Sequence, residues 1–566
     1  MKMFEGDELW GFRKKGGTLM IRHEIKTWDT QRSVKSEKLS RIHSFSSGKI
    51  IQEEQLKQLL ETAIRPGEIV VLEGDNQKQA VQLSKALAEV DPAIVHDLHM
   101  VISCPQMEEH LDIFEKGIAS VLDFSFAGNS SKRIPEMLEA GTLKIGAIHT
   151  YLELYARLFT DLIPNVCLCA ALQADKDGNL YTGPNTEETP TLVEATAFKS
   201  GIVIAQVDEV VDKLPRIDIP GDEVDVIVPV KEPLSIEPLM TRDPAKIKDV
   251  HVLQAMMVIK GIYARHMVQR MNHGIGYNTV AIELLLPTYA EELGLKGKIC
   301  RNWVSNPTPA MIPAIETGWV KSVVAFGSET GMAEYVAARP DVFFTGADGS
   351  LRSNRLLAQT AGLYGMDMFT GATLQMDACG NSSTVTNTRI TGFGGAPNMG
   401  SNPNGRRHVT DAWHSLIIDP KNPVAHGRKL VTQMVRTTTK VGPTFVNELD
   451  AVAMGRKAGL AEAPVMIYGE DLTHLVTEVG IGYVYMAENL EERKKIIAAV
   501  AGDTPVGHSI TDAERRRLHD EGKIVYPKDL DIDPQNATRD WLAAKNMEEI
   551  REWSGGLYEI PDKFKQ

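Results

Sequence analysis

The sequence predicts an α/β protein made of two related halves and a helical C-terminal segment. Short apolar runs of strand length alternate with helix-like stretches. Glycine turns follow two of these runs, and Leu172–Asn179 shares five of eight residues with Leu374–Asn381 at an offset of 202. Shorter matches recur in the same order within one residue of that offset, which indicates a duplication with a long period.

Each half begins with the same succession of elements. Ile69–Leu72 is strand-like, Glu73–Asn76 is a glycine turn, and a helix is expected over Gln77–Glu89, while Met271–Gly276 opens the second half in the same way. Such a turn presents backbone N–H groups to a ligand at the edge of an open sheet. For His273, a structural and a functional role both stay open. The candidate binding residues here are Gly74, Asn76, Gln77, Asn272, His273, Gly274 and Gly276.

The remaining elements define the expected domains. Strands are also expected at Ile202–Val207, Ser322–Phe326 and Ser415–Ile418. The proline-rich stretch Val230–Pro244 marks the boundary between the halves. We therefore expect a poorly ordered N-terminal extension (1–27), a first domain (28–235), a second domain (236–488) and a C-terminal helical segment (489–566).

Composition narrows the possible functions. The 566 residues carry a net charge of −14, which argues against a nucleic-acid binder because such proteins need a basic surface. Five cysteines without a CxxC pair argue against a disulfide framework and a structural zinc site. No run of 18 apolar residues and no signal peptide is visible, so we expect a cytoplasmic protein without a membrane span or a metal.

Three loops rich in glycine and asparagine are candidate sites, since Walker A, HExxH and G-x-S-x-G motifs are absent. Thr391–His408 offers backbone N–H groups and arginines to an anion, although a flexible loop is the alternative. Tyr181–Pro190 is dense in turn-forming residues. Phe326–Gly331 contains Glu329, which is either an exposed functional carboxylate or a helix N-terminal residue. The loops add Asn185, Glu329, Gly394, Gly395, Asn398 and Arg406 to the candidates.

Several long motifs resemble one known family. Glu73–Ala80, Tyr181–Glu187, Asn272–Gly276, Ala338–Gly346 and Gly392–Gly400 are similar to the alpha subunit of malonate decarboxylase, and the resemblance runs from about Trp28 to the C-terminus. More remotely, the chain is similar to the two-domain CoA-transferases. That likeness implies two CoA-transferase-like α/β domains and accounts for the duplication.

The resemblance implies an acyl-carrier-protein (ACP) transferase. Acetate on the ACP thiol would be exchanged for malonate, and partner decarboxylase subunits would then act on the malonyl thioester. The chain would act on the dephospho-CoA-derived arm of the ACP, or on CoA as a surrogate, with no tightly bound cofactor of its own. We expect the glycines of the two turns and of the loop (Gly74, Gly274, Gly276, Gly394 and Gly395) to contact the oxyanion or the thioester, and Asn302, Asn306 or Arg406 to recognise a carboxylate.

One stretch departs from the glutamate-dependent CoA-transferases, in which a glutamate forms a thioester with the enzyme. The matching stretch here, Lys298–Pro307, has no glutamate, and Asn302 or Trp303 takes that place. Asn302 and Ser305 are therefore candidate catalytic residues. We expect direct transfer without a glutamyl intermediate, and the alternative is a displaced carboxylate such as Glu329.

Three other functions remain open at this point. A citrate lyase alpha-type transferase or a CoA-thioester hydrolase would share the fold and differ in the acceptor pocket. A non-catalytic assembly subunit that only docks the ACP belongs to another class. The dense polar loops after both glycine turns favour an enzyme, because a scaffold does not need them.

Overall fold

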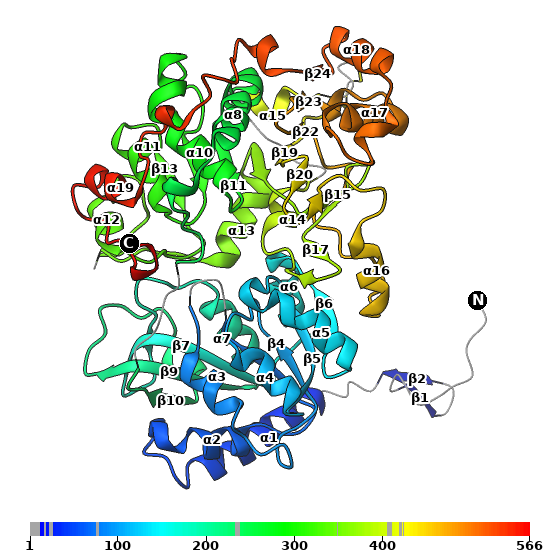
Figure 1. Ribbon diagram of the computed structural model, residues 1–566. Coiled ribbons are helices and arrows are strands. Elements are labelled where there is room, and N and C mark those ends of the chain that lie inside the picture. Colours follow the sequence, from blue (N-terminus) through cyan, green and yellow to red (C-terminus); the bar gives the residue numbers. More distant parts are fainter. Residues whose placement is uncertain are drawn as a thin grey trace.

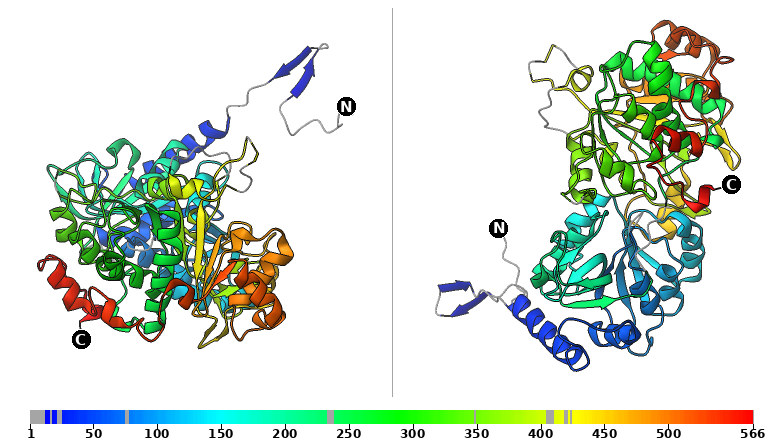
Figure 2. Two further views of the ribbon diagram at one scale, coloured as in Figure 1. Left: turned by 90° about the horizontal axis from the view of Figure 1, so that it is seen from above. Right: turned by 90° about the vertical axis from the view of Figure 1, so that its left-hand side faces the viewer.

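The computed structural model describes residues 12–15, 18–21, 26–74, 78–232, 238–347, 349–403, 410–417, 421–422 and 424–565, with side chains from Thr30 onward. Two lobes stack on each other, and each contains one large sheet (Figures 1 and 2). A small antiparallel hairpin of β1 (Phe12–Lys15) and β2 (Thr18–Ile21) projects away from the lower lobe (Figure 1). Much of the expected N-terminal extension lies outside the described residues.

The first lobe contains a sheet in the order β10-β9-β7-β3-β4-β5-β6, in which every neighbouring pair is parallel. β8 (Leu180–Tyr181) pairs antiparallel with β7. The strands of the order are β3 (Ile69–Leu72), β4 (Leu98–Val101), β5 (Ala119–Phe124), β6 (Lys144–Ile148), β7 (Val166–Asp175), β9 (Ile202–Val211) and β10 (Val226–Pro229).

Both faces of this sheet are buried, as a parallel sheet requires. On β3, Val70 and Leu72 belong to one hydrophobic core and Val71 belongs to another, because successive side chains point to opposite faces. Helices cover both faces. They are α1 (Lys26–Ile42), α2 (Leu56–Ala63), α3 (Val81–Leu87), α4 (Glu109–Glu115), α5 (Arg133–Ala140), α6 (Tyr151–Leu158) and α7 (Thr189–Phe198).

The second lobe repeats this topology. Its sheet has the order β13-β12-β11-β14-β19-β22-β23-β24, and the first six strands are parallel. Taken in order across the sheet, these six strands correspond to β5, β4, β3, β7, β9 and β10 of the first sheet. The shared strand order confirms the predicted duplication. The strands are β11 (Arg270–His273), β12 (Asn302–Val304), β13 (Ser322–Val324), β14 (Met368–Gly371), β19 (Leu430–Met434), β22 (His474–Val476), β23 (Ile481–Gly482) and β24 (Ile524–Val525).

Helices surround this second sheet, and three more form the expected C-terminal segment. The helices of the lobe are α8 (Asp249–Val258), α9 (Ala264–His266), α10 (Tyr277–Leu285), α11 (Ile312–Glu316), α12 (Ala333–Ala338), α13 (Arg355–Tyr364), α14 (Ala396–Met399) and α15 (Asp411–His414). Helix α16 (Asp450–Lys457) packs instead against the first lobe, where Ala451 and Met454 join the hydrophobic core. The helices of the segment are α17 (Leu490–Val500), α18 (Asp512–Asp520) and α19 (Met547–Trp553). The segment also supplies β24, and Ile550 and Tyr558 join the core of the second lobe.

The repeated sequence forms the same turn in both halves. Asp175 Oδ1 accepts hydrogen bonds from the backbone N–H groups of Asp177 and Asn179 at 3.0 Å each. Asp377 Oδ1 accepts the corresponding bonds from Cys379 and Asn381 at 2.8 and 3.0 Å. The clearest repeat in the sequence therefore forms a structural turn in each half.

Two expectations about local structure were wrong or shifted. Ser415 and Leu416 form a turn after α15, not a strand, because a short apolar run does not distinguish a strand from the end of a buried helix. The helix expected from Gln77 begins at Val81 in α3, and 75–77 lie outside the described residues.

Candidate functional site

A cavity of about 170 Å³ lies where the two lobes meet. The second lobe supplies the turn after β11, the end of β14, helix α13 and the glycine loop before α14, and the first lobe adds Phe126 and Tyr151. Figure 1 shows α13 and α14 in the second lobe next to α6 of the first. Most of the wall is aromatic, methionine or glycine, so the site is largely apolar.

The glycine turn after β11 forms one wall. Asn272, His273 and Gly274 line the cavity, as predicted for a ligand-binding turn. His273 Nδ1 lies 3.0 Å from Glu283 Oε1, and its Nε2 lies 2.8 Å from the Tyr263 hydroxyl. Both ring nitrogens are thus engaged by the protein. His273 is a buried and fixed wall residue in this conformation.

The glycine loop forms the opposite wall and crosses to the first lobe. Phe126 and Gly392 form an antiparallel bridge, and the Gly394 N–H donates to Ser125 O at 2.9 Å. Gly392 has φ +75° and a Cβ there would lie 2.4 Å from Ser125 O, so only glycine allows this approach. The loop therefore closes the cavity between the lobes.

Two of the glycine amides expected to bind an oxyanion already have partners. The Gly274 N–H donates to Thr370 O at 2.8 Å, and the Gly394 N–H bonds to Ser125 O. Neither amide is available to a ligand in this conformation. Both glycines still line the cavity, together with Gly395.

Helix α13 brings two polar side chains to the cavity that the sequence interpretation missed. Arg355 and Gln359 are four residues apart, so they share one face of the helix, and both line the cavity. Gln359 Oε1 accepts a hydrogen bond from Asn398 Nδ2, which ties the helix to the predicted loop residue. The Arg355 guanidinium lies over the Tyr151 ring at 4.7 Å.

No simple pattern in the sequence identified these two residues. On α13, Leu357 is 63% exposed while Arg355 is 1% exposed, the reverse of an ordinary surface helix. The residue in the sequence that could have indicated the start of this helix is Asn354, which caps it by accepting a hydrogen bond from Leu357 N–H at 2.8 Å. The cap shows where the helix begins but not which residues face a ligand.

Several predicted residues lie outside the cavity wall. Asn302 lies at the start of β12, whose carboxyl end is the edge toward the site, and it binds Ser322. Asn306 Oδ1 accepts from Gly327 N–H at 3.0 Å, so it fixes the turn next to the lining residue Phe326. Ser305 is buried beside β13, and Gly276 begins α10.

The first-lobe candidates have packing roles. Gly74 is enclosed, since a Cβ there would lie 2.8 Å from His110 Cε1. Asn185 is buried at the contact between the lobes, where its Oδ1 lies 3.4 Å from Ser353 Oγ. The predicted residues Asn76, Gln77 and Arg406 lie outside the described residues.

Glu329, the proposed displaced carboxylate, is buried and not exposed. Its Oε1 accepts hydrogen bonds from Thr241 N–H at 3.0 Å and from Thr241 Oγ1 at 2.7 Å. It does not line the cavity, but it anchors the segment that places Met240 in the cavity wall.

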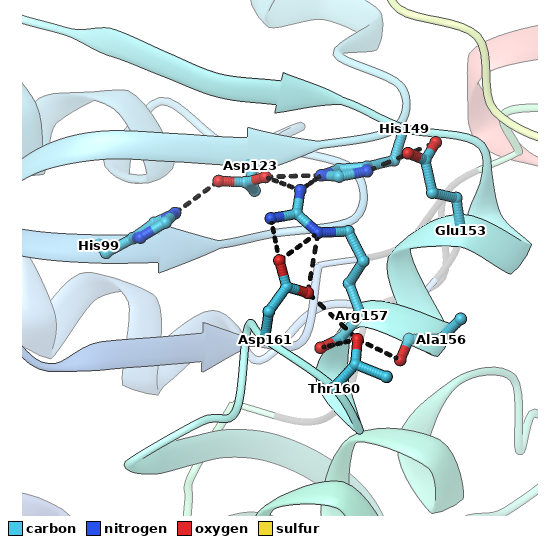
Figure 3. Close-up of polar contacts among 8 residues, drawn as sticks. All are labelled: His99, Asp123, His149, Glu153, Ala156, Arg157, Thr160 and Asp161. Atoms are coloured by element: carbon cyan, nitrogen blue, oxygen red, sulfur yellow. Dashed lines mark hydrogen bonds and ion pairs between the residues drawn. The ribbon is translucent and has the colours of Figure 1, made fainter. Parts of the chain in front are cut away.

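A second polar cluster lies in the first lobe (Figure 3). Asp123 on β5 accepts hydrogen bonds from His99 and His149 at 2.5 Å each, and Arg157 Nη1 approaches it at 3.4 Å. Burial raises the pKa of Asp123, but the two histidines outweigh it and lower the pKa to about 2. Burial lowers the pKa of His149, but Asp123 and Glu153 raise it above its ordinary value.

Within the described residues, no group of three or more His, Cys, Asp or Glu side chains is placed to hold a metal ion. In the same part of the chain, no helix is both long and apolar enough to cross a membrane.

Comparison with known proteins identifies the family. The sequence model of the family described as "Malonate decarboxylase, alpha subunit, transporter" matches residues 27–566. The chain is 51% identical over 547 residues to an acetyl-S-ACP:malonate ACP transferase from Malonomonas rubra, which covers 95% of this chain and 99% of that one.

Solved structures agree with this assignment. A Pseudomonas malonate decarboxylase hetero-tetramer in complex with malonate contains a chain that is 57% identical, with a TM-score of 0.94 and coverage of 96% and 100%. The citrate lyase alpha subunit of Streptococcus mutans, at 16% identity, TM-score 0.58 and coverage of 81% and 87%, shows the fold alone. The chain belongs to the malonate decarboxylase alpha subunit family.

Proposed function

We propose that this chain is the transferase subunit that exchanges acetate for malonate on the thiol of an acyl carrier protein. The family and the curated relative from Malonomonas rubra support the activity. The observation that carries the proposal is the cavity between the lobes, which brings a glycine turn, a glycine loop and one arginine together. A small acid and a thioester can meet there.

The chemistry of direct transfer needs no acyl group on the protein. A malonate oxygen attacks the acetyl carbonyl carbon, and the C–S bond breaks to leave a thiolate and an acetyl-malonyl anhydride. The thiolate sulfur then attacks the malonyl carbonyl carbon, and the anhydride C–O bond breaks to release acetate. No net proton is consumed. The role of the site is to hold both acids beside the thiol and to support each oxyanion.

The cavity wall favours direct transfer over a glutamyl intermediate. Its described lining residues include no Asp or Glu side chain, and Glu329 is bound to Thr241 away from the wall. Reduction with borohydride in the presence of acetyl-CoA tests this step. A glutamate with the mass of the reduced product, anywhere in the chain, would refute direct transfer.

The proposed partners follow from the same relatives. The thiol belongs to the dephospho-CoA-derived arm of an ACP subunit, for which CoA is a surrogate. The Pseudomonas relative is a subunit of a hetero-tetramer, so we propose that this chain also assembles with decarboxylase subunits. These subunits would consume the malonyl thioester.

The deciding experiment uses the purified chain with acetyl-CoA and with malonate, citrate or water as the acceptor. Mass spectrometry should show malonyl-CoA together with matching release of acetate. Citryl-CoA or free CoA would instead indicate a citrate transferase or a hydrolase. No turnover with acetyl-CoA or with acetyl-ACP would favour an assembly subunit.

A substitution separates the enzyme from a scaffold. A Cβ at Gly395 would lie 2.6 Å from Gln359 Nε2, so Gly395→Asp disturbs the cavity wall. A transferase should lose about 100-fold or more in kcat/KM, because misplacement by about 1 Å has such an effect. If the chain is only a scaffold, the variant should still assemble, and neither the unaltered chain nor the variant should show transferase activity.

A further inference from the structure

One positive charge faces an otherwise uncharged cavity. Among the described residues that line the cavity, Arg355 is the only one with a permanent charge. Its side chain is buried, and its guanidinium lies over the face of the Tyr151 ring. A guanidinium is well suited to a carboxylate, because its planar N–H donors match two carboxylate oxygens.

Glu187 of the first lobe holds the Arg355 side chain in place. The side chain of Arg355 forms an ion pair with Glu187, which is fully buried, and the Arg355 backbone N–H donates to Glu187 O at 3.0 Å. Glu187 packs against Gly327, where an added Cβ would collide with the carboxylate. Glu187 does not line the cavity, so Arg355 is the member of the pair that faces it.

This ion pair explains how a charge can stay buried in the resting protein. An isolated charge would be costly there, whereas a paired one is tolerated. The guanidinium has five N–H donors, and one carboxylate does not use all of them. A second carboxylate entering the cavity therefore meets a guanidinium that has more donors than Glu187 alone can accept.

We propose that Arg355 binds the distal carboxylate of the incoming acid and so selects malonate over acetate; this inference rests on the proposed function. Malonate has a second carboxylate to offer the guanidinium, whereas acetate has a methyl group in that place. The methyl group cannot form the charge-assisted hydrogen bond. The reacting carboxylate of malonate is then left for the thioester.

The dimensions and the rigidity of the site fit this role. The cavity has a volume of about 170 Å³, and an engineered cavity of roughly 150 Å³ holds benzene. Malonate is only slightly larger than benzene, so its size fits the cavity. Helix α13 is fixed at both ends, by Asn354 at its start and by Lys429 Nζ, which donates to Gly362 O at 2.6 Å. The arginine is therefore in place before the acid arrives.

The first test uses the unaltered chain and needs no turnover. Isothermal calorimetry should measure binding of malonate, monomethyl malonate and acetate. The monomethyl ester keeps the reacting carboxylate and loses the distal charge, so we expect it to bind at least about 100-fold more weakly than malonate. Equal binding of malonate and its monomethyl ester would overturn the proposal.

The second test uses variants and two reactions. Arg355→Met should raise KM for malonate by about 100-fold or more, and Arg355→Lys by less, because a point charge replaces the fork of donors. Exchange of labelled acetate with acetyl-CoA should lose at least about tenfold less than malonate transfer does in both variants, since acetate does not use the arginine. Arg352→Met is the matched control, because Arg352 is exposed and lies over the Phe344 ring.

The two tests separate the possible failures. If Arg355→Met slows malonate transfer and acetate exchange equally, the arginine is only structural and the proposal is wrong. If the unaltered chain makes no malonyl-CoA yet prefers malonate to the ester in calorimetry, the proposed transfer fails but the carboxylate site stands.

Discussion

The two glycine turns occupy the same place in two related halves, yet among their described glycines Gly274 lines the cavity and Gly74 does not. Gly274 follows β11 and lines the cavity. Gly74 follows β3, the equivalent strand, but its surroundings are filled by His110 and Ile102, whose atoms would lie 2.8 and 2.9 Å from an added Cβ. Burial lowers the pKa of His110 to about 3, so a neutral ring fills this space.

The difference shows that a repeated fold does not repeat a site. The second half carries the cavity because its long insertion between β14 and β19 folds back across the first lobe. Val385 and Ile390 from this insertion, together with Met454 from α16 after β19, belong to the hydrophobic core of the first lobe. The first half has no such insertion between β7 and β9, and among its described residues Phe126 and Tyr151 are the two that line the cavity.

The strongest test of this comparison places alanine in each turn. Gly274→Ala should reduce kcat/KM for malonate transfer by about tenfold or more, because its Cβ would lie 3.2 Å from Gly371 Cα and would shift the cavity wall. Gly74→Ala should instead destabilise the first lobe by about 1–3 kcal/mol through overpacking, with little change in kcat/KM for the folded protein.

Steady-state kinetics and urea unfolding of both variants give the answer. Each variant is the control for the other, since both add one methyl group after an equivalent strand. A large loss of kcat/KM in folded Gly74→Ala would place the first turn in the active site and contradict the comparison.

The cluster around Asp123 predicts a pH dependence that belongs to the first lobe alone. The folded pKa of Asp123 is about 2, below the ordinary 3.8, so its stabilisation is present above pH 3.8 and is lost as the pH falls through about 2. His149 has a raised pKa, so its contribution is complete below pH 6.5 and is lost as the pH rises through the folded value.

Urea unfolding across about pH 2 to pH 9 separates the two contributions, because that of Asp123 changes below pH 4 and that of His149 above pH 6.5. Asp123→Asn should cost about 2 kcal/mol near neutral pH, since a shift of one pKa unit corresponds to about 1.4 kcal/mol. The cost of His149→Gln should shrink as the pH rises. A cost of His149→Gln that grows with pH would show that the histidine is neutral in the fold.

The sequence predicted the fold more completely than the site, for physical reasons. Strands, glycine turns and the repeat are local patterns, and they led to the duplicated sheet. The position of Arg355 depends on Glu187, which is 168 residues away, and on a helix whose polar residues point inward. Asn302 was predicted from its alignment with the CoA-transferase glutamate, and Glu329 from its position at a strand end. In the structure, Asn302 lies at the start of β12, away from the edge that faces the cavity, and Glu329 is bound to Thr241.

The smallest expected effect lies where the two halves are most alike. Asn179 Nδ2 donates to Asp175 at 2.8 Å and Asn381 Nδ2 donates to Asp377 at 2.9 Å, while each Oδ1 accepts from a glycine N–H at 2.8 and 2.9 Å. Asn179→Ala and Asn381→Ala should each cost about 1–2 kcal/mol in urea unfolding and leave kcat/KM unchanged. The two losses should agree within about 0.5 kcal/mol, because the bonds are equivalent. Loss of activity in a folded variant of either turn would mean that the repeat has a catalytic function, although neither turn is among the described residues that line the cavity.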